Sequence, residues 1–453
     1  MEQQAVVQQN QNDLPDIGEL ESMVGILLAE ARAQGAGSAE AAVSVDNGLS
    51  VTVRLGDVET LEYHRDHGLG ITVYFGQRKA SASTSDFSRK SLRETVEAAC
   101  AIARYTSEDR YAGLADADRM ARDIPDLDLY HPWPIGVETA IETTRRCEAA
   151  ARDVDARISN SEGATLATHQ GLRVYGNTHG FMGGYPSTRH SLSCSMIGEE
   201  SGQMQRDYWY TVARNKDGLQ APEVVGRIAA ERTLQRLGAR PVATCDVPVV
   251  FSAEAAGGLF GHFVAAVRGG NLYRKSSFLL DQLGKPVFPA FVHIHEEPTI
   301  KNGLGSAAFD AEGVETVAHD LIRDGVLQSY VLDSYSARKL GMQTTGNAGG
   351  VHNLIIDPGA MALPDLLREM GRGLLVTELM GQGINMVTGD YSRGAAGFWV
   401  EQGEIRFPVE EITIAGNLRD MFRQVVAIGN DVDLRGNIRT GSVLIERMTI
   451  AGQ

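Results

Sequence analysis

The segment VSVDNGLSVTVRL, residues 43–55, decides the fold class of the first half of this chain. Apolar residues alternate with polar ones at Val43, Val45, Val51, Val53 and Leu55, a period of two that is typical of a strand with one buried face. Glycine-punctuated runs follow, including GITVYF at 70–75. Short alternating runs between glycine turns predict an antiparallel meander.

Helical periodicity surrounds the predicted meander. Apolar residues recur every three or four positions from Glu19 to Ala33, which predicts an amphipathic helix. The run Ser91-Leu92-Arg93-Glu94 matches a capping box, so we expect a second helix to begin near Ser91. Beyond a Pro-rich connector at 124–134 the order recurs, which indicates two related α+β units. The elements expected there are a helix over Val137–Val154, a β block over Ile158–Arg214 and a helix over Pro222–Leu237.

The second half of the chain, from Pro241, is glycine-rich and mostly β in character, with helices expected near Ala253–Val267, Leu363–Gly371 and Asn417–Val426. We therefore predict an α+β protein. An N-terminal region of antiparallel sheet and helices, residues 19–240, precedes a β-rich, glycine-rich C-terminal domain, residues 241–453. The first region can divide into subdomains 19–123 and 135–240, joined by the Pro-rich connector. Residues 1–18, rich in Gln and Asn, are expected to form a disordered tail.

Composition excludes several classes of protein. The chain has 453 residues, 43% of them hydrophobic, as in an ordinary globular protein of two or three domains. Its 42 Lys and Arg against 58 Asp and Glu give a net charge of −16, the wrong sign for a nucleic-acid-binding surface. We find no secretory leader and no apolar stretch long enough to span a membrane, so a cytoplasmic protein without a membrane partner is expected. The four cysteines lie about fifty residues apart and are expected to be free thiols.

Common catalytic motifs are missing from the sequence, since GxSxG, the P-loop and HExxH do not occur. His293 and His295 would share one face of a strand and could bind a metal, but no third ligand is indicated, so a solvent-facing strand end is the simpler interpretation. His352 could line a cleft or make a structural hydrogen bond. Arg338 and Arg393 could each grip a carboxylate, or pair at the surface.

Seven segments carry a family resemblance. They are GLGITVYF at 68–75, the run 176–193 containing NTHG and STRHSLS, LFGHFVAAVRGGNLYRKSSFLLDQLGK at 259–285, SYSARKLG at 334–341, TELMGQG at 377–383, GDYSRGAAGFWVEQGEI at 389–405 and the final MTIAGQ at 448–453. They closely resemble the TldD/PmbA (TldD/TldE, modulator of gyrase) metalloprotease family, and specifically its PmbA (TldE) branch. The resemblance covers nearly the whole chain from about residue 20. It implies one PmbA-type and one zinc-bearing TldD-type subunit around a shared cleft, a cytoplasmic peptidase for unfolded or flexible peptides such as leader peptides and antitoxins.

One departure from the family pattern concerns the metal. TldD-type subunits bind zinc through a helical His-Glu-Ala-x-Gly-His motif and a cysteine from a late Cys-Gly pair. The matching positions here place Ala253, Gly258 and Thr440 where the ligands would be. A methyl group or a glycine hydrogen offers no lone pair, so we expect no metal and no cofactor in this chain, and zinc in the partner. Glu254 remains at the general-base position, as a vestige for which we expect a structural role near the helix start. Gly257 would tolerate, with its neighbour, the helix widening that two such histidines need.

The resemblance therefore predicts a non-catalytic PmbA/TldE-type subunit, which completes the substrate cleft of a heterodimeric metalloprotease and is active only with its TldD-type partner. A peptide in this cleft would most simply bind as an added β-strand. Candidate cleft residues are Gly381, Gln382, Gly383, Asp390, Tyr391, Ser392 and Arg393, with Arg338 and His352 as further candidates.

Other functions are open at this point. An autonomous metallopeptidase would need unrecognised ligands such as His262, His293 or His295. A direct action on DNA is suggested only by the historical family name, and the net charge of −16 opposes it. Without its partner, the chain could also form a homodimer.

Overall fold

The alternating segment forms a central strand of a long curved sheet. In the computed structural model, which describes residues 14–452, strand β1 (Ser38–Arg54) buries every second side chain from Ala39 to Val53. Its neighbours on both sides are antiparallel, β2 (Asp57–Phe75) and β4 (Asn160–Asn177). The sheet order is β3-β2-β1-β4-β5-β6, in which β3 is Arg78–Thr84, β5 is Met182–Glu200 and β6 is Gln203–Ala213. The two predicted α+β units therefore share one sheet, joined where β1 pairs with β4.

Helices pack against one face of this sheet, the face to which the odd-numbered residues of β1 point. α2 (Ile17–Ala33) and α3 (Arg89–Tyr105) bury Val43 and Val45 at one end. α4 (Val137–Arg152) and α5 (Pro222–Gln235) bury Val51 and Val53 at the other. The alternation of apolar residues along β1 therefore corresponds to the face of the sheet that the helices cover.

The first helix begins earlier than predicted, and the second begins near the predicted position but with a different N-cap. α2 begins at Ile17 because the Asp16 carboxylate accepts the N–H of Gly18 at 2.8 Å, so the predicted tail is too long by two residues. Residues 1–13 of that tail lie outside the described residues. The capping box predicted at Ser91 is wrong, because Ser88 already has the extended backbone of an N-cap and its Oγ accepts the N–H of Ser91.

The C-terminal domain contains two further sheets around a helix. One sheet has the order β14-β13-β12-β7-β17-β15 and the other β10-β9-β8-β11-β16. Helix α6 (Ala253–Val267) has the predicted bounds, and its buried residues share one core with both sheets. The first sheet comprises β7 (Cys245–Phe251), β12 (Gly373–Met380), β13 (Asp390–Glu401), β14 (Glu404–Asn417), β15 (Val425–Ile428) and β17 (Val443–Ala451). The second comprises β8 (Ile294–Glu296), β9 (His319–Arg323), β10 (Val326–Leu327), β11 (Leu354–Ile356) and β16 (Ile438–Arg439). The remaining helices are α7 (Gly269–Tyr273), α8 (Ser334–Leu340), α9 (Leu363–Met370) and α10 (Leu418–Arg423).

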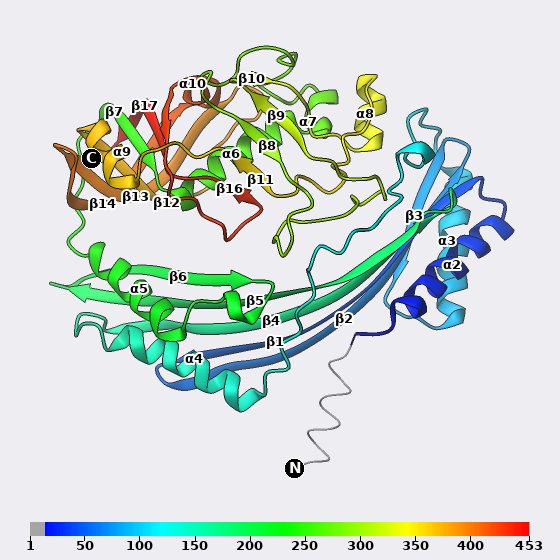
Figure 1. The fold of residues 1–453 in the computed structure, drawn as a ribbon, viewed down its shortest axis with the longest axis horizontal. Coiled ribbons are helices and arrows are strands. Elements are labelled where there is room, and N and C mark those ends of the chain that lie inside the picture. The colour runs from blue at the N-terminus through cyan, green and yellow to red at the C-terminus, as the bar shows by residue number, and fades with distance from the viewer. Residues whose placement is uncertain (1–13, 453) are drawn as a thin grey trace.

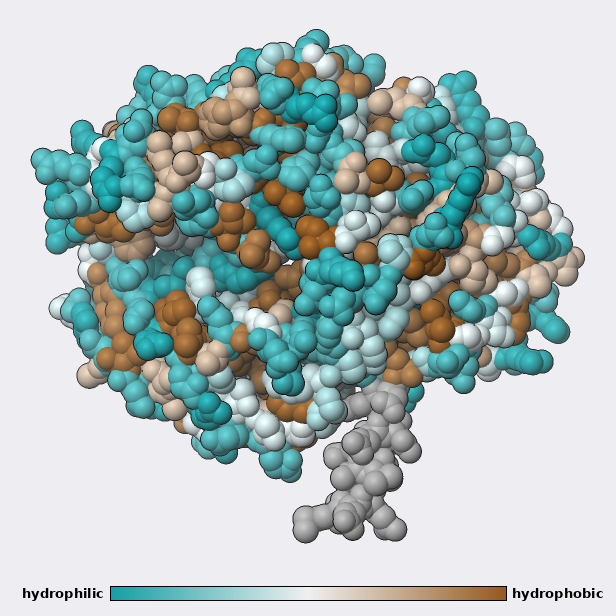
Figure 2. All heavy atoms as spheres, in the orientation of Figure 1, coloured by the Kyte–Doolittle hydropathy of each residue, from teal (hydrophilic) through white to brown (hydrophobic). Residues whose placement is uncertain are grey.

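The C-terminal domain lies over the concave face of the long sheet (Figure 1). Tyr175 and Phe181 from the N-terminal region form a shared cluster with Phe309 and Val314, and the rings of Phe181 and Phe309 lie 5.1 Å apart. Figure 2 shows the surface hollowed between the domain and the sheet. The predicted α+β class is confirmed. Within residues 14–452, no helix has the length and apolar character to cross a membrane.

Candidate functional site

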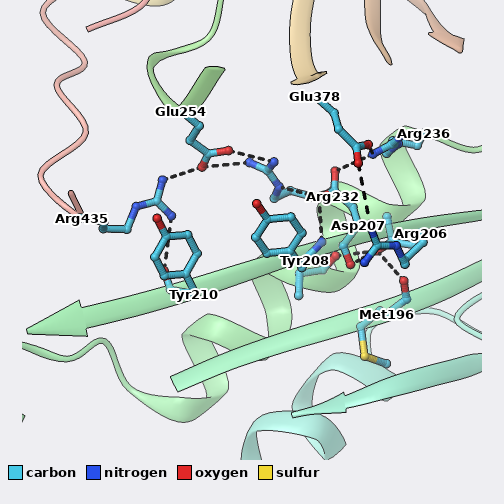
Figure 3. Close-up of polar contacts among 12 residues, drawn as sticks. Met196, Arg206, Asp207, Tyr208, Tyr210, Arg232, Arg236, Glu254, Glu378 and Arg435 are labelled. Carbon is cyan, nitrogen blue, oxygen red and sulfur yellow. Dashed lines mark hydrogen bonds and ion pairs between the residues drawn. The ribbon is translucent and has the colours of Figure 1, made fainter. Parts of the chain in front are cut away.

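The first turn of α6 holds Glu254 between two arginines. Ser252 caps the helix, and its Oγ accepts the N–H of Ala255 at 3.4 Å. The Glu254 carboxylate accepts hydrogen bonds from Arg232 of α5 at 3.1 Å and from Arg435 at 2.6 Å (Figure 3). The three side chains are mostly buried, with exposed fractions of 26% for Glu254, 22% for Arg232 and 16% for Arg435. Both guanidinium groups therefore face the carboxylate where solvent has limited access.

These contacts belong to a larger charge network that joins the two parts of the protein. Arg435 also donates to Asp433 at 2.8 Å, and its guanidinium lies 4.0 Å from the centre of the Trp209 ring on β6. Although burial favours its neutral form, hydrogen bonds to Asp433 and Glu254 raise the pKa of Arg435 above its ordinary value. Its charge is therefore fixed.

A second branch of the network runs along α5 (Figure 3). Arg232 contacts Asp207 of β6 at 3.4 Å, and Arg236 forms ion pairs with Asp207 and with Glu378 of β12. Acidic and basic side chains alternate through these contacts, so each buried charge has an opposite neighbour.

The positions that replace the expected zinc ligands do not fit a metal ion. Gly258 is exposed, and a Cβ added there would meet nothing within 4 Å. Thr440 is fully buried, and its hydroxyl donates to the carbonyl of Gly441 at 3.0 Å. Helix α6 is α-helical throughout, without the widened turn that two histidines five residues apart would need. In the part of the chain that the structure describes, no group of three or more His, Cys, Asp and Glu could hold a metal ion.

The histidines of the alternative ligand set lie in two separate places. His293 contacts Asp320 at 2.8 Å, and His295 contacts Asp357 at 3.1 Å, so both rings are engaged in ion-pair contacts at β8. His262 lies instead beside Tyr391, with 6.1 Å between the ring centres. The three imidazoles do not meet at one point.

Most of the predicted cleft residues gather at one corner of the C-terminal sheet. The Ser392 N–H donates to the carbonyl of Gly383 at 2.7 Å, which brings Gly381–Gly383 against Asp390–Arg393. Gly383 permits this approach, because a Cβ there would overlap the Ser392 carbonyl oxygen. Gln382, Asp390 and Ser392 are exposed, whereas Tyr391 is 2% exposed, and burial raises its pKa to about 12.

The two further candidates lie elsewhere. Arg338 of α8 donates to the carbonyl of Gly113 at 3.1 Å and to the Asp116 carboxylate at 3.0 Å, so it ties α8 to the segment that follows α3. His352 lines a pocket, and burial lowers the pKa of its imidazole. Arg338 and His352 therefore lie in different places, and only His352 lines the pocket.

That pocket, of about 500 Å³, lies between the long sheet and the loops of the C-terminal domain. Arg173 of β4 and Tyr185 and Arg189 of β5 line it from the sheet side. The other side consists of loop residues within 304–311, 348–352 and 435–437. Sequence reasoning missed both arginines, although the strand alternation around them could have placed them on one face.

Three domain models of one family match the chain in order. They are the PmbA/TldA metallopeptidase domain 1 at residues 39–103, the central domain at 130–237 and the C-terminal domain at 244–452. The chain is 54% identical over 426 residues to the metalloprotease PmbA of Escherichia coli O157:H7, with 94% of each chain covered. The chain belongs to the PmbA branch of the PmbA/TldD metallopeptidase family. The predicted family membership is thus confirmed.

Other relatives of this PmbA-type chain are more distant. It is 23% identical over 403 residues to a metalloprotease TldD homologue of Haemophilus influenzae, covering 84% of this chain and 82% of the relative. Among solved structures, a putative modulator of DNA gyrase from Bacteroides thetaiotaomicron has a TM-score of 0.91 at 28% identity, covering 96% of this chain and 99% of the other.

Proposed function

We propose that this chain is the zinc-less PmbA/TldE-type subunit of a cytoplasmic, heterodimeric metalloprotease. A TldD-type partner carries the zinc ion, and the pair cleaves unfolded or flexible peptides, such as leader peptides or antitoxins, in a cleft that this chain completes. Family membership supports the general activity. The division of labour rests on one observation, the engagement of Glu254 by Arg232 and Arg435.

The physical reason concerns what a general base needs. A carboxylate activates water only when one of its oxygens can reach that water, and a metal ion normally lowers the pKa of the water towards neutrality. Both oxygens of Glu254 already accept hydrogen bonds from guanidinium groups. Ala253 and Gly258 provide no lone pair for a metal on the same helix. This arrangement supports a structural role for Glu254 and a catalytic role for the partner.

The test is to purify this chain alone and together with its TldD-type partner. Bound zinc is measured by atomic absorption, and cleavage is followed with an unstructured fluorogenic peptide. We expect zinc and chelator-sensitive cleavage only when the partner is present. Stoichiometric zinc together with cleavage by the isolated chain would overturn the proposal.

Matched substitutions locate the catalytic carboxylate. Glu254→Gln in this chain should leave the turnover of the complex within about twofold, because it removes no group that contacts a reacting water. The same change in the partner's zinc motif should abolish cleavage. Size-exclusion chromatography of the same samples shows whether the isolated chain is a homodimer and whether the mixture forms a one-to-one complex.

A further inference from the structure

Two arginines on the inner face of the long sheet lack an acidic partner. Arg173 lies opposite Ser44 of β1, on the face away from the helices, and Arg189 lies on the same face of the adjacent strand. Both side chains are exposed and line the 500 Å³ pocket. Among residues 14–452, neither guanidinium forms a hydrogen bond or an ion pair.

The charges around the pocket do not neutralise these arginines. Arg214 is half-buried nearby and donates to the carbonyl oxygens of Thr188 at 3.0 Å and Leu304 at 2.7 Å rather than to an acid. Burial and the positive charge of Arg189 both lower its pKa. Arg435, which also lines the pocket, is shared with Asp433 and Glu254.

The pocket lining contains one acidic side chain, Asp310, among the residues that the structure describes. Its oxygens accept the backbone N–H groups of Val314 at 3.0 Å and Ala348 at 2.9 Å. Burial raises the pKa of Asp310 to about 6, even though these hydrogen bonds favour the charged form. Asp310 therefore bonds to backbone groups of its own loop and of residue 348, and it does not neutralise the charge of the two arginines.

A free guanidinium in a half-enclosed pocket is suited to an anion, because its planar fork donates two parallel hydrogen bonds to a carboxylate or a phosphate. The position is notable in a chain whose net charge is −16, where acidic partners are plentiful. We propose that this pocket binds carboxylate groups of the substrate peptide, so that the PmbA-type subunit selects acidic peptides. This inference rests on the proposed function, since it takes the substrate to be a peptide.

The walls of the pocket favour a peptide over a free phosphate ion. Gly349, Gly350 and Gly436 contribute backbone without side chains, and a Cβ added at Gly350 would meet nothing within 4 Å. Such a wall leaves main-chain groups within reach of an extended chain. The rings of Tyr185 and Phe309, 5.5 Å apart, add apolar surface that a phosphate would not cover. The volume is within the range of about 300–1,000 Å³ typical of ligand pockets.

A direct binding experiment tests the inference without requiring catalysis. A fluorescently labelled, unstructured peptide with several Asp and Glu residues is titrated into the complete chain, and anisotropy gives the Kd. Arg173→Gln and Arg189→Gln should each weaken binding by about five- to tenfold, and the double variant by more, because each removes a charge-assisted hydrogen-bond donor. Arg227→Gln is the matched control, since Arg227 is exposed on α5, outside the pocket lining.

Peptide variants identify the source of the carboxylate. Replacing every internal Asp and Glu by Asn and Gln should cost the same affinity as the double variant, and the double variant should bind this neutral peptide as well as the parent chain does. If amidation of the peptide C-terminus alone causes the loss, the pocket holds the terminal carboxylate instead. Inorganic phosphate at millimolar concentration should compete weakly at most.

The inference and the proposed function fail in different ways. Equal binding of acidic and neutral peptides by the parent chain, or unchanged binding in the double Arg→Gln variant, overturns the acidic-peptide pocket even if the heterodimer cleaves as proposed. Zinc and peptidase activity in the isolated chain overturn the proposed function whatever the pocket binds. Arg173→Lys with Arg189→Lys guards against misfolding, since it keeps the charge and should retain part of the affinity.

Discussion

Removing the carboxylate of Glu254 is expected to loosen the junction between the N-terminal sheet and the C-terminal domain. Arg232 comes from α5, Glu254 from α6 and Arg435 from the loop before β16, so the contact joins three segments that are distant in sequence. Glu254→Ala leaves two guanidinium groups facing each other without the acid between them. Glu254→Gln keeps the shape of the side chain and one acceptor oxygen, but removes the charge.

The magnitude follows from the contacts. A hydrogen bond to a charged group contributes about 1.5–3 kcal/mol, and breaking a buried ion pair costs about 3–5 kcal/mol. Glu254 is 26% exposed, and Asp433 and Asp207 still hold Arg435 and Arg232 after its removal, so the lower end applies. We expect the free energy of unfolding to fall by about 2–3 kcal/mol for Glu254→Ala and by roughly half of that for Glu254→Gln.

A double-mutant cycle measures the coupling directly. Urea unfolding of the parent chain, Glu254→Ala, Arg435→Ala and the double variant is followed by tryptophan fluorescence, because the Trp209 ring lies 4.0 Å from the Arg435 guanidinium. The coupling free energy should be about 1–2 kcal/mol. Glu231→Gln, an exposed acid on α5, should change stability by less than about 0.5 kcal/mol. A coupling below about 0.5 kcal/mol would refute the idea that Glu254 stabilises this junction.

Two further predictions concern pH and the metal. Burial raises the pKa of Glu312 to about 7 in the folded chain, so the native state holds this proton more tightly, and the stability present below about pH 4.5 is lost as the pH rises through 7. In Glu312→Gln, the urea midpoint of unfolding should depend less on pH between about 4.5 and 7 than it does in the parent chain. The same pH dependence in both chains would contradict this prediction. Restoring the ligands as Ala253→His, Gly258→His and Thr440→Cys should give only weak zinc binding in a chelator competition, and adding Arg435→Ala should strengthen it by at least about tenfold by removing a nearby positive charge. An equal affinity without the last change would show that Arg435 does not oppose the metal.

The periodic parts of the sequence predicted the fold well, because burial on one face is a local signal. The alternation from Val43 to Val53 predicted β1, and the apolar spacing over Ala253–Val267 predicted α6 with its observed bounds. Element starts were harder, as Ser88 and Ser91 both suit an N-cap and only the backbone conformation distinguishes them. The sequence did not predict that the two α+β units share one sheet, because β1 and β4 pair although they are more than 100 residues apart in the chain.

Around Glu254, the sequence indicated only which metal-ligating side chains are replaced. Ala253, Gly258 and Thr440 could be recognised against the family pattern, because each stands where that pattern requires a ligand. The partners of Glu254 carry no local signal, since Arg232 lies 22 residues before it and Arg435 lies 181 residues after it. Arg173 and Arg189 were missed for a different reason: alternation shows which face of its strand each occupies, but a single arginine on a strand resembles any solvated surface charge.

The presence of Glu254 beside Ala253, on a helix without metal-ligating side chains at positions 253 and 258, has a simple electrostatic explanation. A carboxylate with limited solvent access needs a nearby cation, and the family pattern supplies zinc next to this position in TldD-type subunits. In this chain two guanidinium groups provide the positive charge instead, at 3.1 and 2.6 Å from the carboxylate oxygens. One of them, Arg435, also lines the pocket that holds Arg173 and Arg189. Three arginines therefore line this pocket, and two of them have no acidic partner among residues 14–452, which is the property that an anchor for acidic peptides requires.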